Sequence, residues 1–494
     1  MTRQGLSLLQ RYENTGLLAE LEEAIKSLGK GNGLIPDDYP YKSGPLGNLG
    51  ISYLRRFERL GDIVDLDEAI TTQQQAVRLT PDDHPDKPGR LNNLGTSFLR
   101  RCQHLGDLAD LDEATAAQQQ VVHLTSDGHL NKPRYLNNLG KAFLCRFERL
   151  GDIADLDDAI TTEQQAVHLT PDGHPHQSMY LNDLGSAFCA QLAHHPDNVT
   201  LGQAISTYSR SARSISGSPS VRFTAAHMWA TLCSSDHSNE TFDAYSTLLE
   251  LLPRMVWLGR TVEQRHNDIS IISDAVPNAA AAAIRRGKFD LALEWLEQGR
   301  SVVWGQMLQP LDQLRRHCPN EAQELEKISH ALESAHMVQY PAHSDTTTSQ
   351  TLEEAARAHR RLADAYDRIV RRIRDLPNFE DFLRPRNSAS LCSAAISGPV
   401  VIVNAHTTRC DALILRPHSS QVYHVALPGF QASAALEVQT RLVGLTRGFM
   451  GDAYSEDDSA GSLSDILGQL WLHVVEPILS YLGVSRLLFL RSPR

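Results

Sequence analysis

The segment Leu46-Gly-Asn-Leu-Gly50 returns three times in the first half of this 494-residue chain. Its copies are Leu91-Asn-Asn-Leu-Gly95, Leu136-Asn-Asn-Leu-Gly140 and Leu181-Asn-Asp-Leu-Gly185, so the closing glycines lie 45 residues apart. A fixed period of this length is typical of stacked supersecondary units that bury a core only against their neighbours. The sequence therefore predicts a solenoid.

A second series with the same 45-residue period divides each repeat into two helices. Its members are glycines at three turns, extended at the two ends by one glycine and one proline: Gly61, Gly106 and Gly151, with Gly16 and Pro196. Apolar residues before and after each turn follow helical i, i+3, i+7 spacing, and glycine commonly closes a helix. We expect five repeats of two antiparallel helices over residues 1–217, the first of them incomplete.

The start of each second helix is predicted from acidic or hydroxyl residues that precede the apolar run. Such residues satisfy the unpaired N–H groups of a first helical turn, helped by an acid or amide three residues later. The predicted capping pairs are Asp65 with Glu68, Asp110 with Glu113 and Thr200 with Gln203.

The repeat resembles the tetratricopeptide (TPR) family, whose unit carries an apolar residue, Leu-Gly, an aromatic residue, two alanines and a proline. Here the series is Leu46, Leu49-Gly50, Tyr53, Ala69, Ala76 and Pro81. The stretch between Tyr53 and Ala69 is longer than in the standard unit, as in the extended TPR variants. The resemblance implies an α-solenoid whose first helices line an inner groove.

Composition indicates a large protein of a reducing compartment. The chain has 41% hydrophobic residues, a net charge of −12 and seven cysteines without a C-x-x-C pair. Cysteines without such a pair favour a reducing compartment, so we expect the chain in the cytoplasm, with the nucleus as the alternative. No stretch approaches the ~20 apolar residues that a membrane span needs, so we expect no membrane association.

Residues 218–387 are predicted to be helical without the 45-residue period. Ala279–Trp304 has the pattern of a divergent helix, glycine turn and helix, and apolar stripes at 325–332 and 362–373 predict a helical hairpin around the turn-rich His343–Gln350. The hairpin is rich in arginine, but the chain is acidic overall, so we interpret these arginines as a solvated helix face and expect no nucleic-acid partner.

Residues 388–494 change to short apolar strands mixed with helices, which indicates part of an α/β domain. Strands are expected at 400–403, 412–415, 421–425 and Arg486–Leu490, and helices at 432–445 and 463–482. The segments Leu293–Trp304 and Gly398–Val403 resemble those of fungal TPR proteins that end in a caspase-like CHAT domain. The fold class is thus mainly α: an α-solenoid of extended TPR helix pairs, a helical linker, and a partial α/β CHAT-like segment.

The CHAT resemblance implies a cysteine-protease fold, in which a His followed by Gly ends one strand and a Cys ends the next. This chain has no His-Gly dipeptide and no cysteine after Cys410. His406 and Cys410 are only four residues apart between the first two predicted strands, so we do not expect them to form the family's dyad. The segment is interpreted as an amino-terminal fragment of a CHAT domain without catalytic residues.

One polar column is the candidate peptide-binding site: Asn48, Asn93, Asn138 and Asp183, each just before the Leu-Gly pair of a first helix. By resemblance this position faces the inner groove, where such asparagines hold the backbone of a bound peptide. An amide can both donate to and accept from a peptide unit. The alternative is that these side chains bond only neighbouring helices or water.

Other motifs predict no cofactor and no metal. Gly29–Gly33 lacks the spacing of a phosphate-binding loop. His84, His129 and His174 recur in the loops between repeats, but residues one repeat apart are too distant to share an ion about 2 Å from each ligand, so they are interpreted as turn residues.

The leading functional hypothesis is a non-enzymatic adaptor that binds an extended segment of another protein in the solenoid groove. The alternative is a regulated cysteine protease, with the solenoid as sensor and the CHAT domain as output, of which this chain is an incomplete version. A third hypothesis is a truncated product without function.

Overall fold

The computed structural model describes residues 1–15, 17–36, 39–233, 239–256, 275–303, 309–334, 348–380, 382–383, 386–448 and 456–483. These residues form two compact bodies. The first body comprises Met1–Leu232 with Asn320–Arg371, and the second comprises Cys233–Pro319 with Arg372–Arg494.

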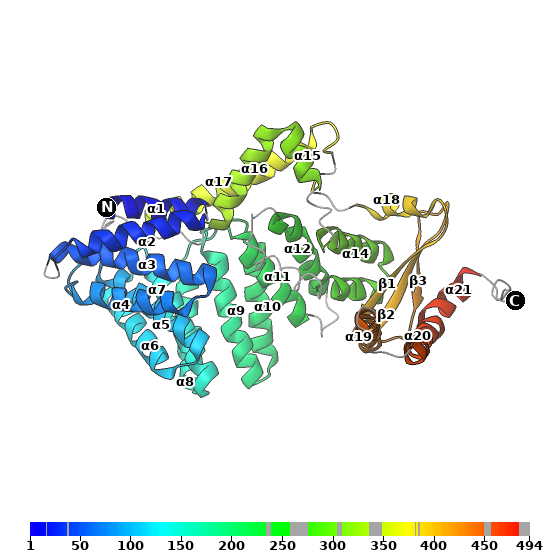
Figure 1. Ribbon diagram of the computed structural model, residues 1–494, viewed down its shortest axis with the longest axis horizontal. Helices are drawn as coiled ribbons and strands as arrows, with labels where there is room; N and C mark the ends of the chain where they lie inside the picture. Colours follow the sequence, from blue (N-terminus) through cyan, green and yellow to red (C-terminus); the bar gives the residue numbers. More distant parts are fainter. Residues whose placement is uncertain are drawn as a thin grey trace. The chain divides into compact units, whose positions relative to one another are not determined.

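The first body contains the predicted array of helix pairs, stacked from blue to green in Figure 1. Its five repeats are α1 (Thr2–Thr15) with α2 (Leu18–Gly33), α3 (Ser43–Leu60) with α4 (Ile63–Arg78), α5 (Lys87–Leu105) with α6 (Leu108–Leu124), α7 (Lys132–Leu150) with α8 (Ile153–His168), and α9 (Gln177–His194) with α10 (Asn198–Arg213). A 3₁₀ turn, η1 (Pro40–Lys42), precedes α3. The prediction of an α-solenoid of helix pairs is confirmed.

The turn glycines close the first helices as predicted. Gly61, Gly106 and Gly151 adopt the left-handed conformation with φ of 74°, 79° and 75°, and each N–H bonds the carbonyl four residues earlier. A side chain at these positions would be strained, which is why glycine recurs there. Gly16 lies outside the described residues.

The predicted capping boxes are wrong by three residues. The second helices begin at Ile63, Leu108, Ile153 and Asn198, and their caps are Asp62, Asp107, Asp152 and Asp197, each accepting from the backbone N–H two residues on. The sequence offers an aspartate at both positions in most repeats. The later one is taken by a tertiary contact: Asp65 is 2% exposed and accepts from Arg56 of α3, with Nε–Oδ2 at 2.8 Å.

The glycine of the opening motif lies where the two helices of a repeat cross closely. A Cβ on Gly50, Gly95, Gly140 or Gly185 would fall 2.5–2.8 Å from a side chain of the second helix. The facing residues also recur with the repeat: Gln73, Gln118, Glu163 and Tyr208. Only glycine allows this crossing distance.

Cores form between repeats as well as within them. One buried cluster joins Ile70 of α4, Phe98 of α5, Leu111 of α6 and Cys145 of α7. Each repeat therefore buries apolar surface against the next, as a solenoid requires.

The first body continues with α11 (Pro219–Cys233), α16 (Pro319–Ser334) and most of α17 (Thr348–Arg374). Of the predicted stripe residues, Leu325, Leu332, Ile369 and Ile373 are buried at 0–3% exposure, and Ile328 and Leu362 are half-buried. Arg360 of α17 donates from Nη1 to the carbonyl of Asp172 at 2.7 Å, so one of the hairpin arginines contacts the loop between α8 and α9. Of the predicted turn His343–Gln350, residues 343–347 lie outside the described part, and residues 348–350 belong to α17.

The second body holds α12 (Asn239–Val256), a helix over 275–285, α14 (Phe289–Val303), α15 (Gln309–His317), α18 (Ser388–Cys392) and the 3₁₀ turn η4 (Ser393–Ala395). The helix over 275–285 and α14 are joined at Gly287, with φ of 69°. This is the predicted helix, glycine turn and helix. The last predicted residue of that segment, Trp304, lies outside the described residues.

A three-stranded antiparallel sheet follows, in the order β1 (Val400–His406), β2 (Arg409–Leu415) and β3 (Val422–Ala426). Val403 pairs with Ala412, and Leu413 pairs with His424. Three helical segments come next: α19 (Ala432–Gly448), α20 (Glu456–Leu470) and α21 (Glu476–Leu482), with the π turn η5 (Trp471–Val475) before α21. Figure 1 shows these helices beside the sheet. The predicted strand Arg486–Leu490 lies outside the described residues.

Candidate functional site

The candidate column lies on the first helices of four repeats, α3, α5, α7 and α9. Successive first helices pack directly against one another, α1 on α3, α3 on α5, α5 on α7 and α7 on α9. The second helices pack mainly on the first helices of their own and the following repeat. The first helices therefore form the more closely spaced layer, which is the inner layer of a curved stack.

All four predicted residues are half-buried on this face. A second asparagine column precedes it by one residue: Asn92 and Asn137 are 4% and 0% exposed. Asn138 donates from Nδ2 to Oδ1 of Asn92 at 2.7 Å, and Asn137 donates from Nδ2 to Oδ2 of Asp183 at 3.1 Å. Each buried amide is therefore bonded to the half-buried residue of the next repeat.

The repeat of α3 and α4 departs from this pattern. It has Gly47 at the position of Asn92 and Asn137 in the next two repeats. Asn93 consequently lacks an amide partner in the preceding repeat, and its Oδ1 receives only a long bond of 3.5 Å from Asn92. The Asn48 side chain makes no hydrogen bond to any described residue. The four residues thus separate into two that join repeats and two whose amide N–H groups are unused.

The far end of the column is charged. Asp183 also accepts from Nζ of Lys141 at 2.8 Å, and the two side chains are 17% and 36% exposed. The pair crosses the junction between α7 and α9. The inner face therefore runs from unengaged amides at Asn48 and Asn93 to an ion pair at Lys141 and Asp183.

A lysine column that our sequence analysis missed fixes the loops between repeats. Lys87 is 7% exposed, and its Nζ donates to the carbonyls of Val77 at 3.1 Å and Thr80 at 2.7 Å. Lys132 makes the equivalent bonds to Val122 and Thr125. A buried ammonium needs such acceptors, and a helix end supplies them. The 45-residue spacing of Lys42, Lys87, Lys132 and Gln177 was the available signal.

The repeated histidines have a local role in the loops between repeats. Nδ1 of His84, His129 and His174 accepts the backbone N–H two residues later, at 3.1, 3.1 and 3.2 Å. The ring thereby closes a tight turn before each first helix. Among the described residues, no three acidic, histidine or cysteine side chains are grouped as a metal site would require.

A hollow of about 770 Å³ is lined by residues of α8, α9 and α10. Its lining includes the apolar side chains of Leu184 and Phe188 and the polar side chains of His168 and Arg210. In this last repeat Gly202 and Gln203 replace the acidic pair present in α8, Asp157 and Asp158. The repeat pattern therefore breaks where the hollow opens.

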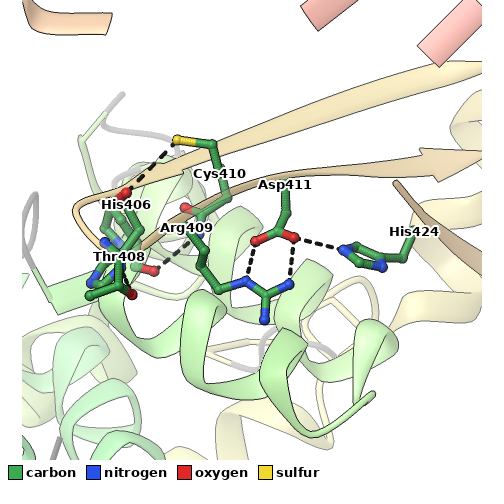
Figure 2. Close-up of polar contacts among 8 residues, drawn as sticks. His406, Thr408, Arg409, Cys410, Asp411 and His424 are labelled. Atoms are coloured by element: carbon green, nitrogen blue, oxygen red, sulfur yellow. Dashed lines mark hydrogen bonds and ion pairs between the residues drawn. The ribbon is translucent and has the colours of Figure 1, made fainter. Parts of the chain in front are cut away.

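In the second body, His406 and Cys410 lie at one end of the β1–β2 hairpin, as Figure 2 shows. Nδ1 of His406 bonds Oγ1 of Thr408 at 2.9 Å, while the Cys410 thiol points to the His406 backbone carbonyl at 3.8 Å. Cys410 is 3% exposed, and burial raises the pKa of its thiol. The two side chains are therefore bonded to other groups and not to each other.

Next to them, Asp411 holds the hairpin through a buried charge network (Figure 2). Its carboxylate is fully buried and accepts from Nε and Nη2 of Arg409 at 2.6 Å and from Nε2 of His424 at 2.7 Å. Burial alone would raise the pKa of Asp411, but the hydrogen bonds from Arg409 and His424 outweigh it, and the pKa lies below its usual value. His424 also stacks on Phe289, with ring centroids 4.7 Å apart.

Within the described part of the chain, every helix is too short or too polar to span a bilayer. No protein-family model matches the sequence, and no curated protein matches it either.

Among solved structures, the chain is similar to the nearly identical TPR-like repeats of a candidate kinesin light chain from Podosopora anserina and to a variant of those repeats with a single substitution. The identities are 18% and 17%, the TM-score is 0.33 for both, and the match covers 43% of this chain and 97% and 96% of theirs. At these values the likeness carries no argument about function. The array described above is a solenoid of antiparallel helix pairs on its own geometry.

Proposed function

We propose that this chain is a non-enzymatic scaffold that binds an extended segment of a partner protein on the inner face of its solenoid. Helical-repeat solenoids generally present such extended surfaces to partners. The observation that carries the proposal is the pair of half-buried amides, Asn48 and Asn93, whose N–H groups no described side chain or backbone group uses. They lie one repeat apart on neighbouring first helices.

The side-chain amides of Asn48 and Asn93 can bind a peptide backbone because each carries both hydrogen-bond donors and an acceptor. Each carboxamide can donate to a peptide carbonyl and accept from a peptide N–H, which reads the backbone rather than the side chains. A net hydrogen bond contributes about 1 kcal/mol, or about fivefold in affinity. Asn138 and Asp183 have a different role in this proposal, since their side chains already join adjacent repeats.

We place this function in the cytoplasm, because none of the seven cysteines, all of which the structure describes, is in a disulfide, as expected in a reducing compartment. The assignment of residues 388–494 to part of a CHAT domain remains a proposal that rests on sequence resemblance. In the described part of this segment, the side chains of His406 and Cys410 are bonded to other groups and not to each other.

The test starts from selection of peptides on the full-length chain from a phage-displayed library of random sequences. Affinity for a selected peptide is then measured by titration calorimetry for the wild type and for Asn48→Ala combined with Asn93→Ala. We expect the double variant to bind about tenfold or more weakly, with unfolding temperature close to wild type.

The matched control is Asn138→Ala, which removes a bond between repeats. It should lower the unfolding temperature and change the affinity much less than the double variant does. Equal affinity of the wild type and the double variant would overturn the proposed site, and failure to select any peptide would overturn the proposed function.

A further inference from the structure

Glu163 occupies a position that holds an uncharged amide in the two preceding repeats. Gln73, Gln118 and Glu163 each face the motif glycine of their own repeat and are 1%, 2% and 2% exposed. A Cβ on Gly140 would lie 2.7 Å from Cγ and 2.9 Å from Cδ of Glu163. The crossing of α7 and α8 therefore encloses this carboxyl group with no room for a water shell.

The groups around the carboxyl do not compensate a negative charge. Oε2 of Glu163 has no hydrogen-bond partner among the described residues. The charged groups that face it are Asp183 of α9 and Lys141 of α7. The ammonium of Lys141 is already bonded to Asp183 at 2.8 Å, and Asp183 in turn lies near the phenol of Tyr208 on α10.

We propose that Glu163 is held as an uncharged carboxylic acid in the folded protein, and that its ionisation loosens the junction between the fourth and fifth repeats. Loss of the proton would place two carboxylates, Glu163 and Asp183, beside the single ammonium of Lys141. The junction concerned includes Asp183 and Asn137, which join α9 to α7. The solenoid thereby contains a pH-sensitive element at one end of its inner face.

The expected titration supports this geometry. Burial raises the pKa of Glu163 well above its usual 4.5, the charge of Asp183 raises it further, and Lys141 lowers it less than these two raise it. An acid whose pKa is higher in the folded state stabilises the fold below its unfolded pKa. That stability is lost as pH rises through the folded value.

The test compares Glu163→Gln with the wild type in thermal unfolding of the full chain at pH values from below 4.5 to 9. Below 4.5 the two proteins should unfold at similar temperatures, because both then carry a neutral group at this position. As pH rises, Glu163→Gln should become more stable than the wild type by at least about 3 °C. Curves that stay parallel across the whole range would overturn the proposal.

The repeat supplies a matched variant, since Gln118→Glu places a carboxyl at the equivalent position of the preceding repeat. It should add a second loss of stability as pH rises. A readout independent of folding is the carboxyl ¹³C shift of Glu163, assigned in glutamate-labelled protein by its absence from Glu163→Gln. Titration of that signal near 4.5 would contradict the proposal. Neither measurement involves a peptide, so these results are independent of the peptide-binding test of the proposed function.

Discussion

Buried charge is used in different ways in the repeats of the first body and in the sheet of the second body. In the repeats the same arginine–aspartate contact recurs between first and second helices, at Arg56–Asp65, Arg101–Asp110 and Arg146–Asp155. In the sheet a single carboxylate, Asp411, receives Arg409 and His424. Repetition spreads one kind of contact over several junctions, whereas the sheet depends on one residue.

The largest effect is expected for Asp411→Ala, which leaves Arg409 and His424 without their acceptor. Removal of one partner of a buried pair costs ~3–5 kcal/mol, and the partial exposure of Arg409 and His424 reduces this to about 3 kcal/mol. The comparison variant is Asp110→Ala, for which we expect a smaller loss, because Arg101 keeps a second partner in Asp67 at 2.8 Å. Chemical denaturation of both variants measures the difference, and equal losses would contradict it.

Asp411 should also make the sheet sensitive to acid. Its folded pKa lies below its usual 3.8, so its contribution to stability is present above 3.8 and is lost as pH falls through the folded value. Asp411→Ala should therefore differ from the wild type at pH 6 and converge with it in strong acid. Near-ultraviolet circular dichroism over this range checks the prediction, and a constant difference down to the lowest pH would contradict it.

A smaller effect is expected for Gly185→Ala at the crossing of α9 and α10. The added Cβ would fall 2.8 Å from the Tyr208 ring, which is rigid and cannot yield as a glutamine can. Overpacking of this kind costs about 2 kcal/mol. The control Gly89→Ala meets only the Tyr135 hydroxyl at 3.8 Å and should be neutral or slightly stabilising. Unchanged stability of Gly185→Ala would show that the helices can separate at low cost.

The next effect in size concerns the lysine column. Lys87→Met removes the donor for the buried carbonyls of Val77 and Thr80, and we expect a loss of about 1–2 kcal/mol in urea unfolding. The matched change Lys87→Gln copies the residue found at position 177 and should cost less, because an amide still donates. Equal losses for the two variants would indicate that packing, rather than the hydrogen bonds, decides this position.

The smallest stability change is expected for Gly47→Asn. A Cβ at Gly47 meets nothing within 4 Å, and replacement of glycine by asparagine inside a helix gains a few tenths of a kcal/mol in helix propensity. The new amide would also be placed to bond Asn93, as Asn92 bonds Asn138 at 2.7 Å. Thermal unfolding should show a modest rise, and a fall would mean that the position does not accommodate the pattern of the later repeats.

Repetition also explains how much of the fold was predictable. The 45-residue period located helices and closing glycines, because each position was sampled several times. Helix starts were misplaced where two aspartates compete, since only the tertiary contact of Asp65 with Arg56 decides between them. In the sheet, β2 begins at Arg409, ahead of the predicted 412–415, because the polar residues Arg409 and Asp411 are satisfied by a network that has no period.

The candidate site was only partly predictable for the same reason. The four predicted residues look equivalent in the sequence because they share one column: Asn48, Asn93, Asn138 and Asp183. Their spacing cannot show which of them form hydrogen bonds to the preceding repeat. That distinction depends on Gly47, Asn92 and Asn137, one residue earlier in each repeat. In the sequence, the difference is visible only as a glycine in place of asparagine at position 47. That this glycine leaves Asn93 without an amide partner could be inferred only from the hydrogen bond between Asn92 of α5 and Asn138 of α7.

The most direct test of the central claim measures peptide affinity and stability together in Gly47→Asn. The account predicts opposite signs: the variant should be as stable as the wild type or more stable, yet bind a selected peptide about fivefold more weakly, because the Asn93 amide is then engaged within the array. Affinity that stays equal to wild type or increases, in a variant that is folded and at least as stable, would contradict the claim that free amides on the inner face bind the partner.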